Sequence, residues 1–313
     1  MGRIFLYQVQ DGEAGMTIEH FLRSRGYSHH LLGLLKRSEE GILLDGRRQF
    51  ANQPLSVGDR LEIHLPQEES SPHIRPVAIP FSILYEDEDL LVVNKPANTP
   101  IHPSPGNYDN TLANGLADYF QRKGEPFVYR CINRLDRDTT GLLLLARHAL
   151  SGSLLSAQMT RRRIHRTYRA LVEGLTEAKG KISLPIGRKP GSIIERCIDP
   201  VTGDPAITHY KTLAQKGDIS YVELKLETGR THQIRVHMAA IGHPLLGDSL
   251  YNPQGLPGMD RQALHSYSLE FLHPIKKEAM HVTAPLPDDM QNILSTWDAP
   301  GNLPSSEPSA GSY

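Results

Sequence analysis

Short continuous apolar runs, each bordered by polar turn residues, mark the middle of the chain. Residues 90–93 read Leu-Leu-Val-Val, and residues 142–146 read Leu-Leu-Leu-Leu-Ala. Runs of this length are too short for a helix and are typical of strands buried on both faces. The first run leads into Lys95-Pro96, and the second follows the turn-forming residues 138–141, Asp-Thr-Thr-Gly. The pattern therefore predicts two buried strands with polar loops at their ends.

The first 65 residues show a different pattern. Apolar residues at helical spacing predict two short helices, over residues 16–25 and 28–37. Two strands are predicted at 41–46 and 57–63, the first of which runs into an Asp-Gly turn. Residues 66–80 then hold four prolines and little apolar periodicity, as expected of an extended linker.

This change of pattern predicts two domains. The chain has 313 residues and 39% hydrophobic content, enough for one large or two medium-sized cores. We expect a small domain over residues 1–66, a linker over 67–80 and a large domain over 81–296. Residues 297–313 are rich in Pro, Ser and Gly and are expected to be a disordered tail, because they cannot bury enough apolar surface to order themselves.

Composition narrows the class of protein. No apolar run approaches the roughly 18 residues that span a bilayer, and no signal-peptide pattern opens the chain, so a soluble cytoplasmic protein is expected. Cys131 and Cys197 are too few and too far apart for a disulfide framework or a cysteine zinc site. The formal charge is −1, so any surface that binds nucleic acid must be a local patch. The acidic run at 86–89 is expected to be a solvated turn.

Asp136 is the first candidate for chemistry. It lies between Arg134 and Arg137, directly before the turn that leads into the second buried strand. Neighbouring cations favour the ionised carboxylate, which can act as a nucleophile or a base. The alternative is that Asp136 and Asp138 only cap a turn while the arginines neutralise them.

A local basic patch is the second candidate. Residues 160–169 contain five arginines and one histidine and lead into a predicted strand over 168–172. Clustered guanidinium groups suit phosphate, and the embedded Tyr168 can stack on a base. The alternative is an ordinary solvated basic face. The candidate phosphate ligands are Arg161, Arg162, Arg163 and Arg166.

The third candidate is a helix within residues 229–244. Thr231 is the predicted N-cap, and Gly242 before Pro244 is a stop signal. Arg235 then occupies a defined helix face, from which its fork of donors can bind a carboxylate on a neighbouring strand. Histidines 232 and 237 lie five residues apart with no glutamate between them, so no metal site is expected.

Together these segments resemble the RluA family of pseudouridine synthases. The Arg-Leu-Asp-x-x-Thr-x-Gly-Leu-Leu-Leu motif of that family is present at residues 134–144. A strand followed by Lys-Pro matches 92–96, an Arg-x-Tyr-x-Ala strand matches 166–170, and Gly-Arg-x-His-Gln-Ile-Arg-x-His matches 229–237. Asn133 replaces the histidine that usually precedes Arg-Leu-Asp. Residues 12–65 loosely resemble the small alpha-L RNA-binding domain.

The resemblance implies a fold, a reaction and roles for particular residues. The fold is α+β, with a mixed, largely antiparallel sheet and flanking helices behind a small α/β domain. The enzyme would convert uridine in structured RNA to pseudouridine by base flipping, without a cofactor. Asp136 would carry the essential carboxylate, Arg235 would pair with it, and Tyr168 would stack on the uracil. Arg134 would fill the vacated base stack, and arginines 161–163 would hold the RNA backbone.

The sequence leaves several substrates and functions open. Large-subunit ribosomal RNA is the first choice of substrate, and transfer RNA is the second. A catalytically silent RNA-binding or ribosome-assembly factor would share the fold. A metal-dependent hydrolase that uses some of the 15 histidines is a further alternative. The protein is expected to be a monomer.

Overall fold

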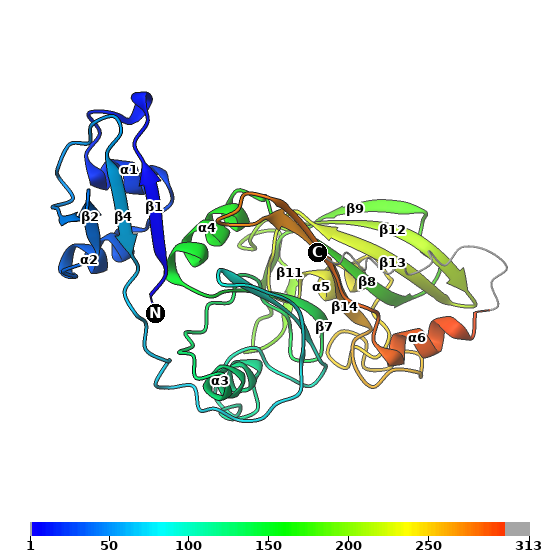
Figure 1. Ribbon diagram of the computed structural model, residues 1–313. Helices are drawn as coiled ribbons and strands as arrows, with labels where there is room; N and C mark the ends of the chain where they lie inside the picture. Colours follow the sequence, from blue (N-terminus) through cyan, green and yellow to red (C-terminus); the bar gives the residue numbers. More distant parts are fainter. Residues whose placement is uncertain (1, 298–313) are drawn as a thin grey trace. The chain divides into compact units, whose positions relative to one another are not determined.

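The computed structural model describes residues 2–297 (Figure 1). By their contacts these residues form two compact units. Unit 1 holds the chain up to Thr167 together with Ser266–Ala284, and unit 2 holds Tyr168–His265 together with the segment that starts at Pro285. The tail predicted over 297–313 lies outside the described residues except for Trp297. No described helix is long and apolar enough to cross a membrane.

Unit 1 begins with a small domain of two helices and a four-stranded sheet. In chain order its elements are β1 (Ile4–Gln8), a short 3-10 turn (Asp11–Glu13), α1 (Ile18–Ser24), α2 (His29–Arg37), β2 (Ile42–Leu44), β3 (Arg47–Arg48) and β4 (Arg60–His64). The strands lie in the order β1-β4-β2-β3. The hydroxyls of Thr17 and Ser28 cap the two helices, because each accepts a hydrogen bond from the N–H three residues further on.

The helices and strands predicted in this region are confirmed, with slightly different ends. Strand β1 was not predicted, although it pairs with β4 along its whole length. Residues 67–80 form no helix or strand. The domain boundaries at 66 and 80 stay predictions.

The core of the small domain includes part of α4 (Ala149–Thr160). Leu150 of that helix belongs to the same buried apolar cluster as Phe21 and Leu31. The Ser153 hydroxyl donates a hydrogen bond to the Gly26 carbonyl at 2.8 Å. The small domain therefore packs on α4 through a shared apolar core.

The rest of unit 1 is built on a sheet that holds the two predicted buried strands. Its strands lie in the order β5 (Ser82–Glu86), β6 (Leu90–Lys95), β7 (Thr140–Ala146) and β14 (Leu264–Leu272). Strand β15 (Ala279–Thr283) pairs with β14 outside this order. The pairings β5–β6, β6–β7 and β14–β15 are antiparallel. Every residue of β7 is buried, as the apolar run predicts. Helix α3 (Leu112–Arg122) completes this part of the unit.

Unit 2 contains four neighbouring strands and a hairpin. The strands are β8 (His165–Glu173), β13 (Ile219–Leu226), β12 (Ile207–Lys216) and β9 (Lys179–Ser183), and β8 enters the unit at Tyr168. The hairpin pairs β10 (Ile186–Arg188) with β11 (Arg196–Ile198). Two helices follow, α5 (Gln233–Ala240) and α6 (Asp288–Ser295). A largely antiparallel sheet with a few flanking helices confirms the predicted α+β class.

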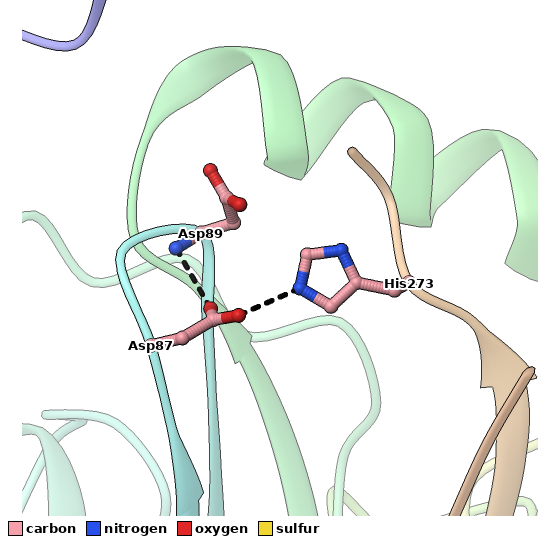
Figure 2. A group of neighbouring side chains, drawn as sticks. All are labelled: Asp87, Asp89 and His273. Carbon is pink, nitrogen blue, oxygen red and sulfur yellow. Dashed lines mark hydrogen bonds and ion pairs between the residues drawn. The ribbon is translucent and has the colours of Figure 1, made fainter. Parts of the chain in front are cut away.

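The acidic turn between β5 and β6 is part of an internal polar network, so its prediction as a solvated turn is wrong for Asp87 and Asp89, whereas Glu88 is exposed. Asp89 is 1% exposed. The carboxylate of Asp87 pairs with Nε2 of His273 at 2.8 Å and accepts a hydrogen bond from the Asp89 N–H at 2.9 Å (Figure 2). Nζ of Lys276 lies 2.9 Å from the same carboxylate. These contacts join the β5–β6 turn to the loop between β14 and β15.

Candidate active site

Asp136 lies on the turn that enters β7. The side chain is half-buried, and its neighbour Leu135 is buried. The backbone carbonyl of Asp136 accepts a hydrogen bond from the Thr139 N–H at 3.2 Å, which closes the turn. Gly141 follows with φ +104°, and a Cβ at this position would clash with the backbone of Ser266. The motif therefore needs glycine here, because β7 and β14 approach each other too closely for a side chain.

A buried lysine is hydrogen-bonded to the backbone of the Asp136 turn. Lys95, at the end of β6, is 0% exposed. Its ammonium group donates hydrogen bonds to the carbonyls of Arg137 at 2.7 Å, Pro96 at 2.8 Å and Thr99 at 2.9 Å. Three carbonyl acceptors match the three donors of an ammonium group and offset the cost of burying its charge. Lys95 thus connects the loop after β6 to the residue that follows Asp136.

A second set of contacts connects the same two loops closer to the surface. The Thr99 N–H donates to the Arg137 carbonyl at 3.1 Å. Nε of Arg137 donates to the Asn98 side-chain oxygen at 2.8 Å, and the Asn98 N–H donates to the Asp138 carboxylate at 3.1 Å. Asp138 therefore stabilises the turn, and Asp136 remains the candidate for chemistry.

The side chain of Asn133, which stands where the family usually has histidine, binds the backbone of β7. It is 6% exposed, and its amide nitrogen donates to the Leu142 carbonyl at 3.1 Å. Its amide oxygen accepts from the Leu144 N–H at 2.8 Å. The side chain thus bonds like a short piece of strand along β7, a role that the sequence alone did not indicate.

The predicted RNA-binding arginines of unit 1 are largely exposed. Arg134, which lies two residues before Asp136 in the chain, is exposed. Three exposed arginines, Arg161, Arg162 and Arg163, form the turn between α4 and β8. Arg162 has φ +56°, a left-handed conformation that closes the end of the helix. Arg166 on β8 is half-buried.

In unit 2, Arg235 is held by an acidic residue, Asp248, to which the sequence assigned no role. Nε and Nη2 of Arg235 bind the two carboxylate oxygens of Asp248 at 2.7 and 2.8 Å. The Asp248 side chain is fully buried and also accepts the backbone N–H groups of Leu250 and Tyr251 at 3.1 Å. This bidentate pair fixes the guanidinium plane. Asp248 lies in a loop 13 residues away, where no periodic pattern indicates such a partner.

The start of α5 differs from the prediction. The N-cap is His232, in the left-handed conformation with φ 57°, so Thr231 is not the cap. Nδ1 of His232 lies 2.8 Å from the hydroxyl of Tyr251. The Arg235 guanidinium lies over the Tyr251 ring, 5.0 Å from its centroid. His232 and Tyr251 therefore support the helix end that carries Arg235.

Tyr168 is 4% exposed at the point where β8 enters unit 2. Its neighbour Arg169 points to the opposite face of the strand, where it pairs with Glu223 of β13 at 3.1 Å. The predicted site residues thus divide between the units, with Asp136, Arg134 and the basic turn in unit 1 and Tyr168 and Arg235 in unit 2. The pairing of Asp136 with Arg235 remains a prediction.

His237, a candidate metal ligand by residue type, is already bound by protein groups. It is 0% exposed, and its ring nitrogens lie 2.9 Å from the Thr208 hydroxyl and 2.9 Å from the Leu184 carbonyl. Burial lowers the pKa of His237. Both of its ring nitrogens therefore already have protein partners.

Among the described residues, Asp87, Asp89 and His273 come close enough together to offer ligands to an ion (Figure 2). However, Lys276 lies 2.9 Å from the Asp87 carboxylate, and Arg3 lies 3.3 Å from that of Asp89. These cations would repel a metal ion. We assign this group a structural role.

The chain is similar in sequence and in fold to RNA pseudouridine synthases. A family model described as RNA pseudouridylate synthase matches residues 89–240. A Bacillus subtilis protein named uncharacterized RNA pseudouridine synthase YjbO is 39% identical over 280 residues, which cover 89% of this chain and 98% of that protein. Ribosomal large subunit pseudouridine synthase D of Haemophilus ducreyi is 40% identical over 250 residues, which cover 76% of each chain. The solved structure of human RNA Pseudouridylate Synthase Domain Containing 1 has a TM-score of 0.54 and 28% identity, and the match covers 69% of this chain and 94% of that one.

Proposed function

Because this chain belongs to the RluA family of RNA pseudouridine synthases, we propose that it isomerises specific uridines of large-subunit ribosomal RNA. The enzyme class itself follows from the family: the chain is an isomerase that acts on RNA. The choice of ribosomal RNA is supported by relatives of 38–40% identity that are named ribosomal large subunit pseudouridine synthase D. Transfer RNA is the second candidate substrate.

The observation that carries the proposed mechanism is the rigid placement of Asp136. In the reaction the bond between ribose and uracil N1 breaks and a new bond forms between the ribose and uracil C5. C5 loses its proton and N1 gains one, so the product is an isomer of the substrate. The reaction has no net redox change, so it needs neither a redox cofactor nor an energy source. We assign Asp136 as the carboxylate that attacks or deprotonates the ribose as the first bond breaks. The contacts from Lys95 and Asn98 to the Asp136 turn support this assignment, because a catalytic group must be held in a fixed geometry.

Arg235 supplies positive charge to the same step. Asp248 binds Nε and Nη2 of Arg235, so the orientation of the guanidinium is set before RNA arrives. A cation that is oriented in advance stabilises the ionised form of Asp136 without reorganisation during the reaction. Tyr168 stacks on the flipped uracil in this scheme.

The exposed arginines hold the RNA. Arg134 enters the base stack that the flipped uridine leaves, which offsets an unstacking cost of a few kcal/mol. Arginines 161–163 bind backbone phosphates without reading sequence. The small domain adds exposed cations on α2 and β3, namely Lys36, Arg37, Arg47 and Arg48.

Tritium release tests this function directly. The substrate is total RNA from cells that lack the gene, grown with uridine that carries tritium at C5. Formation of pseudouridine at a labelled site releases that tritium into water. The proposed function predicts release by the wild-type protein and none by Asp136→Asn. RNA binding without release by the wild type would favour a catalytically silent binding protein.

A further inference from the structure

The β10–β11 hairpin of unit 2 exposes two adjacent isoleucines at its tip. Ile193 is 85% exposed and Ile194 is 65% exposed. The loop that carries them is ordered by its own hydrogen bonds. The Ser192 hydroxyl accepts the N–H groups of Ile194 and Glu195 at 3.3 and 3.0 Å. Two neighbouring exposed β-branched side chains form a narrow apolar projection on this ordered tip, and contact with a partner would remove their apolar surface from water.

Cationic side chains surround this projection. Nη1 of Arg188 donates to the Ile193 carbonyl at 2.9 Å. Arg196 donates to the Glu195 carbonyl at 3.3 Å, and Lys189 pairs with the Glu195 carboxylate at 2.7 Å. Residues 186–198 thus carry three cations and one acid. An apolar tip with an excess of positive charge complements RNA, which offers base faces between phosphates.

The base of the hairpin is joined to the helix that carries Arg235. The Arg196 N–H donates to the Tyr251 hydroxyl at 2.8 Å, and that hydroxyl contacts His232 of α5. Ile186 of β10 packs against Val236 of α5. Ile193 lies three residues before Arg196, a reach of at most about 10 Å. The tip and Arg235 therefore keep fixed positions relative to each other within unit 2.

We propose that Ile193 and Ile194 form a wedge that inserts between stacked bases of the RNA substrate beside the target uridine. This inference rests on the proposed function, because it takes the bound RNA as the occupant. Isoleucine is among the side chains that proteins insert between base steps to unstack them. A wedge next to the site would open the stack from which the uridine must flip.

The test uses the full-length chain with both isoleucines replaced, Ile193→Ser together with Ile194→Ser. Both positions are exposed, so folding should be unaffected, and circular dichroism checks this. A companion variant with leucine at both positions keeps apolar bulk. Val201→Ser is the matched control, since Val201 is 90% exposed in the same unit but lies outside the hairpin. The binding probe is in vitro transcribed large-subunit ribosomal RNA. A second probe is a stem-loop with 2-aminopurine, whose fluorescence rises when the base unstacks.

The serine variant should bind RNA at least about tenfold more weakly than wild type, because it loses the apolar surface that two isoleucine side chains bury between bases. It should also lose the rise in 2-aminopurine fluorescence. The slope of binding against salt should not change, because no charge is removed. The leucine variant should bind several-fold more tightly than the serine variant, and Val201→Ser should bind as wild type does.

Wild-type affinity and fluorescence in the serine variant would overturn the wedge. So would loss of self-association in that variant by light scattering, since the tip would then be an interface between copies of the chain. If the wild type released no tritium from the labelled RNA, the proposed function would fail. The binding and fluorescence measurements would still decide whether the tip enters RNA.

Discussion

Lys95 donates a 2.7 Å hydrogen bond to the backbone carbonyl of Arg137, the residue that follows Asp136. A charged, fully buried side chain thus binds the backbone of the turn that carries Asp136. The same ammonium group also binds two carbonyls of its own loop. Lys95 therefore connects the Lys-Pro segment to the Arg-Leu-Asp segment, about 40 residues further along the chain, and together they fix the backbone of the Asp136 turn.

Lys95→Met should damage both stability and catalysis. Methionine has a side chain of similar length to lysine but no donor group, so the buried carbonyls lose their hydrogen-bond donors. We therefore expect a loss of about 3 kcal/mol in the free energy of unfolding. We also expect kcat to fall more than RNA affinity, because the Asp136 turn loses its support. Urea unfolding and single-turnover tritium release measure the two effects. Lys216→Met is the control, since Lys216 also donates to a carbonyl but is exposed, and it should change neither quantity. A fully active Lys95→Met protein would contradict the positioning role.

Asp248→Asn should weaken the arrangement around Arg235. A buried bidentate pair that loses one charge typically costs about 3 kcal/mol or more. The guanidinium also loses its fixed orientation, so we expect kcat to fall at least about tenfold.

The matched control for Asp248→Asn is Asp289→Asn. Asp289 forms a bidentate pair with Arg261 at 2.7 and 2.8 Å at the start of α6, but its side chain is 42% exposed whereas that of Asp248 is fully buried. This control should lower stability by a smaller amount and leave kcat unchanged. Equal losses of kcat in the two variants would mean that Asp248 acts only through stability.

Gly141→Ala tests the close approach of β7 to β14. The positive φ disfavours alanine, and its Cβ would meet the Ser266 backbone, which cannot move cheaply. We expect a loss of more than about 2 kcal/mol in stability, or failure to fold, measured by thermal unfolding. Gly12→Ala is the control, because nothing lies within 4 Å of a Cβ at that position. Similar melting temperatures for both variants would contradict the structure of this corner.

The Asp87 network should make stability depend on pH. Burial raises the pKa of Asp87, but hydrogen bonds from Lys276, two backbone N–H groups and His273 outweigh it and hold the pKa well below its ordinary value of 3.8. Because the folded-state pKa is depressed, this stabilisation is complete above the unfolded value and is lost as the pH falls below about 4.

Asp87→Asn should therefore lower the melting temperature at pH 7 and flatten its decline in acid. The melting temperature is measured from pH 7 to pH 2, with Asp260→Asn as a control because Asp260 is exposed. Parallel curves for wild type and Asp87→Asn would show that the network does not stabilise the fold.

Local patterns in the sequence predicted the elements whose signals are local. The apolar runs predicted β6 and β7, and helical spacing predicted α1 and α2. The position of Arg235 on a helix was correct even though the cap was assigned one residue early, because a left-handed His232 has no propensity signature.

Partners far apart in the chain could not be predicted in this way. Nothing in the pattern pairs Arg235 with Asp248, or Asp87 with His273. Each contact depends on how strands from distant segments pack. The acidic turn was predicted to be solvated because charge runs usually are, whereas here tertiary partners bury Asp89.

The most direct test of the proposed function is to map pseudouridine in total cellular RNA by carbodiimide-dependent stops of reverse transcription. RNA is compared from cells with the gene, cells without it, and deleted cells that express either the wild type or Asp136→Asn. The proposed function predicts that one or more sites in large-subunit ribosomal RNA disappear with the gene, return with the wild type and stay absent with Asp136→Asn. Restoration of those sites by Asp136→Asn would contradict the role of Asp136, and an unchanged map in the deleted cells would contradict the proposed function.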